Sequence, residues 1–229
     1  MSKNQEDKNS DVIVDVQETY SKVEHFVEKN KKMLSISVGG IVAVIALYFA
    51  YSHFYIGPKE IEAQSSIFMA EKYFEKDSLE KAINGDGINY GFIDIIDEYS
   101  GTKTANLAKY YLGISYLKTG KYQEAIDQLK SFSSTDIFLS SISLGAIGDA
   151  QMELGEIDKA ISSYEKAANN NSNELTSPMY LFKAGLAYEE NGNYEKAVEK
   201  YTTIKNDYPE SSEGRTIEKY LARAEALIK

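Results

Sequence analysis

The chain of 229 residues has no cysteine, no tryptophan and two histidines. Without cysteine it forms no disulfide, offers no thiol nucleophile and cannot hold a metal through thiolates. His25 precedes an apolar stretch and His53 lies near the far end of it, so we expect neither a histidine catalytic pair nor a histidine metal site. A glycine-rich phosphate loop is also missing. The sequence therefore predicts no enzyme, no cofactor and no metal site.

Positive charge is scarce relative to negative charge. Lysine and arginine number 25 against 35 aspartate and glutamate residues, which gives a formal net charge of -10. The acidic residues are spread along the chain, and no basic stripe of the kind that neutralises phosphates interrupts them. Nucleic acid is therefore not an expected partner.

Charged residues are missing from one long segment, between Lys32 and Lys59. As a helix, residues 33–55 would reach about 34 Å, enough to cross a hydrocarbon core about 30 Å thick. A cleaved signal peptide would have a shorter apolar region, a brief basic start and a small-residue cleavage site. Here about thirty polar residues precede the apolar run, and aromatic residues gather at its far end, as in an interfacial belt. We predict a retained, single-pass transmembrane helix at 33–55.

The lysines around this segment predict its orientation. Four lysines lie between residues 22 and 32, whereas only Lys59 and Lys72 lie comparably close after the segment. The positive-inside rule then keeps the N-terminus in the cytoplasm and places the rest of the chain on the opposite side of the membrane.

Three small residues, Ser35, Gly39 and Ala43, recur every four positions within the predicted span. Such a stripe lets another membrane helix approach closely, so we interpret it as a membrane docking face. The alternative is that small residues are simply frequent in membrane helices.

The residues before the span divide into two parts. Residues 1–10 are polar, mixed in charge and without periodicity, which predicts a disordered cytoplasmic tail. In residues 11–32 apolar side chains recur at intervals of three and four, which predicts an amphipathic juxtamembrane helix. This helix either lies on the inner leaflet or binds a cytoplasmic partner. In the alternative, it is only a helical lead-in to the span.

An internal repeat dominates the part after the span, residues 59–229. Segments 106–139, 141–174 and 178–211 align with one another, and each has a small residue, then a turn glycine, then an alanine. Small residues let two helices cross closely, and the turn glycine ends the first helix in a left-handed conformation. The pattern predicts helical hairpins, and the repeated positions are Gly113, Gly148 and Gly185, then Gly120, Gly155 and Gly192, then Ala125, Ala160 and Ala197.

These positions resemble the tetratricopeptide repeat motif, in which Leu-Gly, Tyr, Ala, an aromatic residue and Pro stand at set offsets. The motif's tryptophan is missing, and the first two repeats lack the proline. The resemblance implies an all-α fold: a single N-terminal transmembrane helix, then a tetratricopeptide-type α-solenoid with a degenerate repeat before residue 106 and a capping helix at 213–229. The matching residues are Leu112, Gly113, Tyr116 and Ala125; Gly148, Ala160, Tyr164 and Ala167; and Gly185, Tyr188, Ala197, Tyr201 and Pro209.

A repeat array of this kind has a concave face, lined by the first helix of each hairpin. Here that face is mostly apolar, and such surfaces suit extended or helical hydrophobic segments. Lys, Arg and Asn residues that would grip a terminal carboxylate are missing from it. In the alternative, the helix at 60–77, the capping helix or a second protomer already fills the groove. The predicted groove residues are Leu107, Tyr110, Ile114, Leu117, Ile142, Met152, Met179, Phe182 and Leu186.

The layout of tail, span and small repeat domain, with the run Phe26–Asn30 before the span, resembles the YfgM-like ancillary subunits of the bacterial SecYEG translocon. The resemblance implies a bacterial inner-membrane protein whose periplasmic repeats bind proteins beside the translocon. Its expected partners are the translocon, a membrane-anchored chaperone and unfolded, newly exported clients. Two alternatives stay open: a structural scaffold or adaptor for envelope assembly or secretion machinery, and a repeat receptor facing the cytosol on a eukaryotic organelle.

Overall fold

The computed structural model describes residues 6–228, and their side chains from residue 22 onward. Every regular element in this part of the chain is helical, and none of these residues forms a strand. The all-α class expected from the sequence is therefore confirmed. The chain divides into two units, residues 1–57 and residues 58–229.

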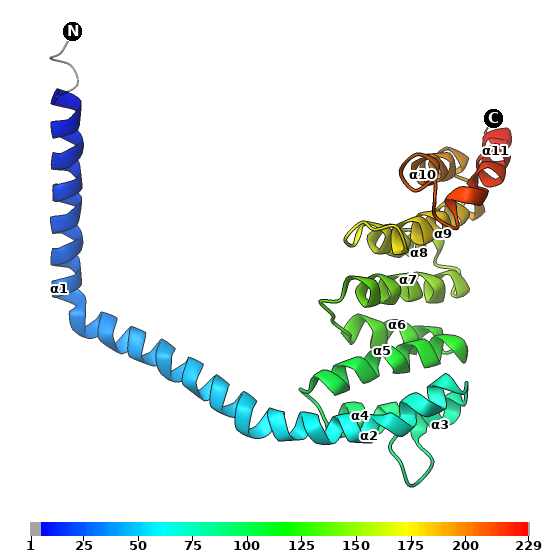
Figure 1. Cartoon of the computed structure of the whole chain (residues 1–229), viewed down its shortest axis with the longest axis horizontal. Helices are drawn as coiled ribbons and strands as arrows, with labels where there is room; N and C mark the ends of the chain where they lie inside the picture. The colour runs from blue at the N-terminus through cyan, green and yellow to red at the C-terminus, as the bar shows by residue number, and fades with distance from the viewer. Residues whose placement is uncertain (1–5, 229) are drawn as a thin grey trace. The chain divides into compact units, whose positions relative to one another are not determined.

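The first unit is one long helix, α1 (Glu6–Tyr51), followed by a short π-helical segment, η1 (Ser52–Ile56) (Figure 1). Residues 6–10 are thus helical, and the prediction of a disordered tail is wrong for them, because neither proline nor glycine occurs before Gly39 to stop the helix. Residues 1–5, the rest of that predicted tail, lie outside the described residues. No break in the helix separates the predicted juxtamembrane part from the predicted span.

The π-helical segment has a local cause. Pro58 lies two residues beyond its end, and proline has no backbone N–H with which to continue an α-helical ladder. The N–H of Gly57 donates instead to the carbonyl of Ser52, five residues back, which is the π-helical pattern. The bulge thus marks the end of the apolar segment.

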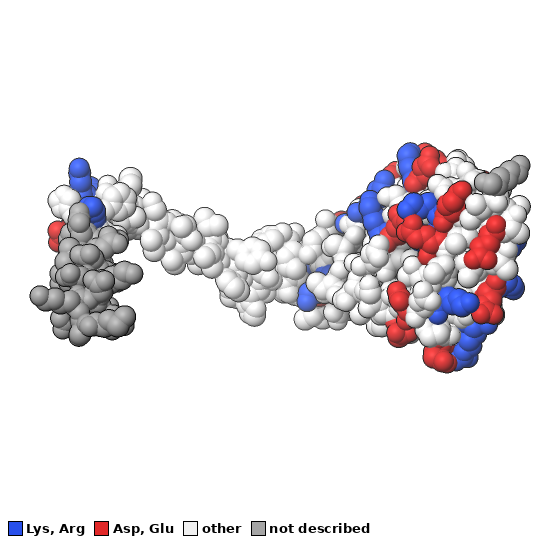
Figure 2. Space-filling model, turned by 90° about the horizontal axis from the view of Figure 1, so that it is seen from above, with Lys and Arg blue, Asp and Glu red and all other residues white. Residues whose placement is uncertain are grey.

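The apolar part of α1 leaves its side chains uncovered. Val38, Ile45 and Leu47 are 59%, 50% and 71% exposed, and one 18-residue window has a mean hydropathy of 2.2 with none of it buried. Figure 2 shows a run of uncharged surface along this segment on the face in view. Covering one such side chain is worth about 1.5–3 kcal/mol, so a helix that exposes all of them in water is unfavourable. This helix is a candidate membrane anchor.

The second unit begins with three helices that pack onto the first repeat hairpin. They are α2 (Gly57–Glu75), α3 (Leu79–Asn84) and α4 (Phe92–Glu98). Their buried side chains share one core with those of the next helix. Helices α2 and α4 lie where the sequence predicted a degenerate repeat, with its first helix at 60–77 and the end of the partner helix at 90–99. The shared core consists of Ala63, Ile67, Ala70, Ala82, Ile83, Phe92, Ile95, Tyr99, Ala105, Ala108 and Leu112.

Glu60 ties α2 to the start of the first repeat. Its carboxylate accepts hydrogen bonds from the backbone N–H of Lys103 at 2.6 Å and from the hydroxyl of Thr104 at 2.7 Å. The first N–H groups of a helix have no partner within the helix, and a negative charge there is favourable. Partial burial raises the pKa of Glu60, but the hydrogen bonds from Thr104 and Lys103 outweigh it, and the pKa is lowered.

Three helical hairpins follow, and they stack one on the next (Figure 1). Each hairpin turn contains a glycine with a positive φ, between 73° and 77°, as the sequence predicted. A 3₁₀ turn, η2 (Gly214–Thr216), and a last helix, α11 (Ile217–Leu227), close the chain. The hairpins are α5 (Lys103–Lys118) with α6 (Tyr122–Ser131), α7 (Ile137–Glu153) with α8 (Ile157–Asn169), and α9 (Thr176–Glu190) with α10 (Tyr194–Asp207).

Within each hairpin the two helices cross at the predicted small residue. A Cβ added at Gly148 would lie 2.6 Å from Cε1 of Tyr164, and one at Gly185 would come closer still to Tyr201. In the first hairpin Gly113 faces a different side chain, and an added Cβ would lie 2.6 Å from Cγ of the Leu129 side chain. The close crossing inferred from the sequence is therefore present in all three hairpins.

Candidate protein-binding groove

The nine predicted groove residues all lie on the first helices of the three hairpins. Four are on α5, two on α7 and three on α9, and α7 contacts both of the other helices. Eight of them are partly buried, whereas Leu186 is 36% exposed. That they line one groove remains a prediction, but the three helices that carry them form one continuous layer.

Part of this layer is filled by the packing of the hairpins themselves. Tyr110 lies 5.5 Å from Phe132 between ring centroids, and Ile114 and Leu117 pack against the core that joins α6 to α7. Burial raises the pKa of the Tyr110 hydroxyl. These side chains of α5 support the fold as well as the surface.

An aromatic stack fills the middle of the layer. Tyr180 of α9 lies over Gly145 of α7, so closely that even a Cβ at Gly145 would clash with the ring. The same ring stacks on Tyr164 with centroids 6.5 Å apart, and Nζ of Lys183 lies 5.8 Å and 5.9 Å from the two ring centroids. The sequence carried one signal of this packing, a glycine at a groove-facing offset of α7.

The carboxylate of Asp149, on the same layer, is paired from two sides. It accepts a hydrogen bond from the Tyr164 hydroxyl at 2.7 Å, and it forms an ion pair with Nζ of Lys183 at 2.7 Å. Burial and the neighbouring Asp149 carboxylate raise the pKa of Tyr164. Tyr164, Asp149 and Lys183 thus link both helices of the second hairpin to the first helix of the third.

The same arrangement recurs one repeat later. The carboxylate of Glu189 accepts a hydrogen bond from the Tyr201 hydroxyl at 2.8 Å and pairs with Arg223 of α11 at 2.7 Å. Burial, and then the hydrogen bond to Glu189, raise the pKa of Tyr201. We call these two sets the Tyr164 triad and the Tyr201 triad. Both of these carboxylates are thus paired within the fold.

The last helix covers one end of the layer. The ring of Phe182 meets the ring of Tyr220 from α11 edge to face, with centroids 4.6 Å apart. It also lies 6.0 Å from Tyr201. For Phe182, therefore, the alternative that the capping helix fills the groove agrees with the structure.

An opening remains between α7 and α9. Its volume is about 250 Å³, below the range of about 300–1,000 Å³ typical of small-molecule pockets. Met152 and Leu186, two of the predicted groove residues, meet there. A hollow of this size accommodates one apolar side chain of a partner. Its lining consists of Asp149, Met152, Tyr164, Lys183, Leu186, Ala187 and Glu190.

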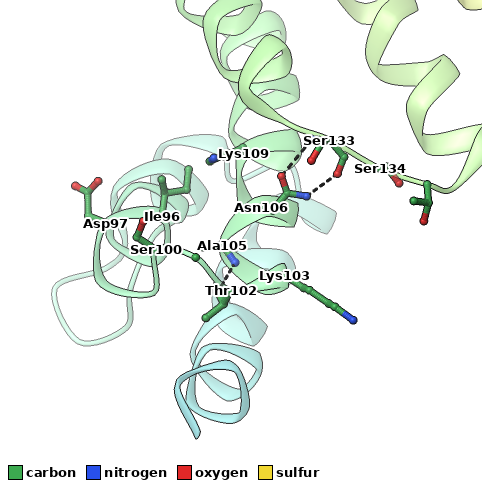
Figure 3. Close-up of a pocket in the computed structure, with 12 residues that line it drawn as sticks. Ile96, Asp97, Ser100, Thr102, Lys103, Ala105, Asn106, Lys109, Ser133 and Ser134 are labelled. Carbon is green, nitrogen blue, oxygen red and sulfur yellow. Dashed lines mark hydrogen bonds between the residues drawn. The ribbon is translucent and has the colours of Figure 1, made fainter. Parts of the chain in front are cut away.

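A larger hollow of about 940 Å³ lies between the end of α4, the start of α5 and the loop before α7 (Figure 3). Hydroxyl and amide groups dominate its lining, and none of the predicted groove residues belongs to it. Asn106 fixes one wall: it donates to the Ser133 carbonyl at 2.7 Å and accepts from the Ser133 N–H at 3.2 Å. Lys103 and Asp97 point away from each other, so no acid–base pair forms there.

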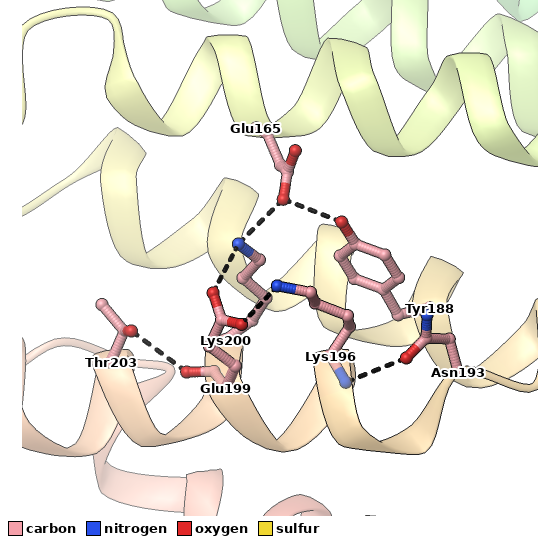
Figure 4. Close-up of polar contacts among 7 residues, drawn as sticks. All are labelled: Glu165, Tyr188, Asn193, Lys196, Glu199, Lys200 and Thr203. Carbon is pink, nitrogen blue, oxygen red and sulfur yellow. Dashed lines mark hydrogen bonds and ion pairs between the residues drawn. The ribbon is translucent and has the colours of Figure 1, made fainter.

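Ion pairs also join the second helices of the last two hairpins (Figure 4). Glu165 of α8 accepts from Lys200 of α10 at 2.8 Å and from the Tyr188 hydroxyl at 3.0 Å. Burial lowers the pKa of Lys200, but the pairing with Glu165 and Glu199 outweighs it, and the pKa is raised. In the part of the chain with described side chains, no three His, Asp or Glu residues gather as metal ligands would.

Sequence comparison identifies the repeats. Residues 107–135 and 180–211 match one tetratricopeptide repeat family, and residues 142–174 match a second. The chain therefore carries three tetratricopeptide repeats, in the three hairpins described above. No curated protein matches the chain in sequence.

Solved structures with the same architecture support this result. The TPR-like repeats of a kinesin light chain-type protein from Podosopora anserina superpose with a TM-score of 0.55 at 17% identity, over 72% of this chain and 86% of that one. The MamA protein superposes with a TM-score of 0.52 at 20% identity, over 75% of this chain and 90% of that one. At these identities the likeness shows the fold alone, a solenoid that generally serves as a non-enzymatic scaffold for protein interactions.

Proposed function

We propose that this chain is a membrane-anchored module that binds proteins beside the bacterial Sec translocon. In this role its repeats contact a membrane-anchored chaperone and newly exported, unfolded chains. The observation that carries the proposal is the pairing, in one chain, of a long apolar helix with exposed side chains and a tetratricopeptide solenoid whose predicted groove residues are all apolar or aromatic. The finer role, beside the translocon, rests on the layout of tail, span and repeats.

The anchor is residues 33–55, with the N-terminus in the cytoplasm and the repeats in the periplasm. The excess of lysine before this segment supports that orientation. Ser35, Gly39 and Ala43 form the face on which a translocon helix docks. A Cβ added at Gly39 would meet nothing within 4 Å, so nothing among the described residues covers this position.

The groove binds clients through weak, adaptable contact. Met152 is flexible enough to fit different side chains, and Leu186 is the most exposed of the predicted groove residues. The pairing of Asp149 and Glu189 removes charges that would demand one particular partner. Shallow apolar contact of this kind permits release, which a client needs before it folds.

The translocon role is tested by affinity purification of the full chain from detergent-solubilised membranes. The proposal predicts that the wild-type chain recovers Sec subunits, and that replacement of Gly39 by Leu, which bulks the docking face, reduces the recovery. An exposed apolar residue on the opposite face of the helix, Ile41, serves as the matched control through Ile41→Leu. If the wild-type chain recovers no Sec subunit, and tagged Sec subunits used as reciprocal baits do not recover the chain, the translocon role is wrong.

The groove role is tested by Leu186→Asp. The matched control is Leu175→Asp, because Leu175 is 66% exposed and lies in the turn before α9, outside the predicted groove. Client binding should weaken in the first variant alone. Tyr110 and Phe182 are poor positions for this test, because both pack against neighbouring rings and a charge there would disturb the fold.

The same variant separates this role from that of a scaffold for envelope assembly or secretion machinery. A scaffold binds folded partners, so Leu186→Asp would then break a defined complex while binding to unfolded clients stayed unchanged. Under our proposal, binding to unfolded clients is what weakens.

A further inference from the structure

The outer side of the second repeat has two adjoining hollows. They lie where α7 is flanked by α6 and α8, and their volumes are about 480 Å³ and about 600 Å³. Leu144, Ser162 and Lys166 line both, so the two form one elongated groove. We call it the outer groove. None of the nine residues predicted for the concave face belongs to it.

The outer groove has more lysines than carboxylates, although the chain as a whole is acidic. Lys130, Lys159 and Lys166 line its first hollow, against one carboxylate, Asp158. Among the described residues, Lys130 and Lys166 have no ion-pair partner. The carboxylate of Asp158 already accepts a hydrogen bond from the side chain of Asn191 at 3.0 Å. In a chain with a net charge of -10, a hollow lined by three lysines and one carboxylate is locally positive.

The second hollow adds Glu165, whose charge is already compensated. This carboxylate pairs with Lys200 of α10 at 2.8 Å, on the side facing the third hairpin. Lys159 pairs with Glu156 at 2.7 Å, but its side chain is 65% exposed, and such surface pairs exchange partners at little cost. An incoming carboxylate therefore meets three available cations.

The floor of the first hollow includes apolar side chains. Leu144 and Ile147 of α7 form part of it, and the amide oxygen of Gln151 is already bonded to the Ser163 hydroxyl at 2.6 Å. Along α8, Lys159 and Lys166 are seven residues apart, which places them on one face of the helix and about 10 Å apart along its axis. The groove thus offers two cations along α8 with an apolar strip of α7 beside them.

We propose that the outer groove binds an acidic segment of a protein partner, in which two carboxylates about 10 Å apart flank an apolar side chain. Residues seven apart on a helix, or three apart in an extended strand, meet this spacing. Charge complementarity favours such a segment, and the apolar strip favours a peptide over an isolated anionic headgroup, which would leave Leu144 and Ile147 without a partner. The site is separate from the concave groove, so the chain holds two proteins at once.

The test uses the full chain in detergent and a fluorescent helical peptide that carries two glutamates seven residues apart with leucine between them. One variant combines Lys130→Glu, Lys159→Glu and Lys166→Glu. The matched control carries the same change of net charge at exposed lysines elsewhere, Lys72→Glu, Lys76→Glu and Lys219→Glu. We expect the peptide to bind the wild-type chain, about tenfold more weakly to the outer-groove variant, and with less than about a twofold change to the control.

Two outcomes would overturn the proposal: no binding of the acidic peptide to the wild-type chain, or equal weakening in both triple variants, which would indicate unspecific attraction. A third is preferential binding of anionic phosphatidylglycerol vesicles through the same lysines, which would assign the groove to a lipid surface.

A second measurement avoids charge reversal altogether. Ser162→Cys places the chain's single thiol in the middle of the outer groove, since the chain has no other cysteine. A thiol-reactive acidic peptide should label it faster than a neutral peptide does, and added salt should remove the difference. Equal labelling rates would contradict the proposal. Leu186→Asp should leave both measurements unchanged, so the failure of one proposed site is distinguishable from that of the other.

Discussion

Where their two helices cross, the second and third hairpins pack a tyrosine against the small residue, whereas the first packs a leucine there. Tyr164 and Tyr201 lie against the crossing glycines, and each hydroxyl donates to a carboxylate. That carboxylate is also paired with a cation, from α9 in the first case and from α11 in the second. Leu129 takes this place in the first hairpin and has no hydroxyl to offer. The Tyr122 hydroxyl does reach Glu153 of α7 at 3.1 Å, but on the exposed surface.

The first hairpin is held instead from its N-terminal side. The ring of Tyr111 on α5 stacks on Phe92 with centroids 5.3 Å apart and meets Phe74 at 5.1 Å. Glu60 binds the first N–H groups of α5. The three hairpins share one backbone pattern but are stabilised differently. Aromatic packing and a capping carboxylate stabilise the first hairpin, whereas hydrogen-bonded ion pairs stabilise the second and third. Equivalent substitutions should therefore have unequal effects in the two parts.

The largest difference is expected for Gly→Ala at the crossing positions. In Gly185→Ala the new Cβ meets the buried ring of Tyr201, which its hydrogen bond to Glu189 holds in place. Overpacking costs about 1–3 kcal/mol and outweighs the helix propensity gained, so we expect a net loss of about 2 kcal/mol. In Gly113→Ala the neighbour is Leu129, which is free of such a bond, and the loss should stay below about 1 kcal/mol. Urea unfolding followed by circular dichroism measures both.

Gly148→Ala is the internal check on this series, because Gly148 faces a hydrogen-bonded tyrosine as Gly185 does. It should resemble Gly185→Ala more than Gly113→Ala. Equal losses in all three variants would mean that the triads do not stiffen their hairpins.

A smaller effect is expected when a single hydroxyl is removed. Tyr201→Phe keeps the ring but leaves Glu189 with Arg223 alone, and a buried hydrogen bond to a charged group is worth about 1.5 kcal/mol. Tyr122→Phe removes an exposed bond to Glu153 and should cost less than about 0.5 kcal/mol. The free energies of unfolding give this contrast directly.

A double-mutant cycle then tests the Tyr201 triad as a unit. If Tyr201, Glu189 and Arg223 act together, the effects of Tyr201→Phe and Arg223→Met will not add. Additive losses would show that the hydrogen bond and the ion pair are independent.

The smallest effect concerns Glu60 and depends on pH. Its pKa is lowered from an ordinary value of 4.5, so its contribution to stability is present above that value and is lost as the pH falls through the folded-state pKa. Glu60→Gln should cost about 0.5 kcal/mol at neutral pH, because solvent screens a carboxylate on this surface, and the difference from wild type should shrink in acid. Thermal unfolding between pH 3 and pH 7 follows it.

Glu98→Gln provides the control for this pH dependence, since Glu98 is exposed at the end of α4. It should leave the pH profile as in wild type. A difference between wild type and Glu60→Gln that stays constant with pH would show that the Glu60 carboxylate does not carry the effect.

The repeated parts of the fold were predictable because they follow from local chemistry. The turn glycines Gly120, Gly155 and Gly192 require a positive φ, and small residues at a fixed offset require a close crossing. The start of the long helix was misplaced because polar composition alone does not distinguish a tail from a helix that no glycine or proline interrupts. Glu6–Ser10 is helical for that reason.

The triads and the outer groove were not predictable, because their members come from different helices. Asp149 and Lys183 are 34 residues apart, and only the stacking of α7 on α9 brings them together. Lys130 and Lys166 likewise share a groove because α6 and α8 flank α7. The concave-face positions followed from the repeat offsets, but the ring of Tyr180 over Gly145 and the cover of Phe182 by α11 depend on neighbouring repeats.

Membrane anchoring with exported repeats is the claim on which the proposed function depends, and labelling of single cysteines tests it most directly. The chain has no cysteine, so Lys118→Cys in the repeats and Glu28→Cys before the apolar segment each provide one reporter. With a membrane-impermeant maleimide, we predict that Lys118→Cys is labelled once the outer membrane is opened, whereas Glu28→Cys is labelled only after lysis of the inner membrane. Labelling of Glu28→Cys first, or release of the chain by alkaline carbonate, would contradict the account.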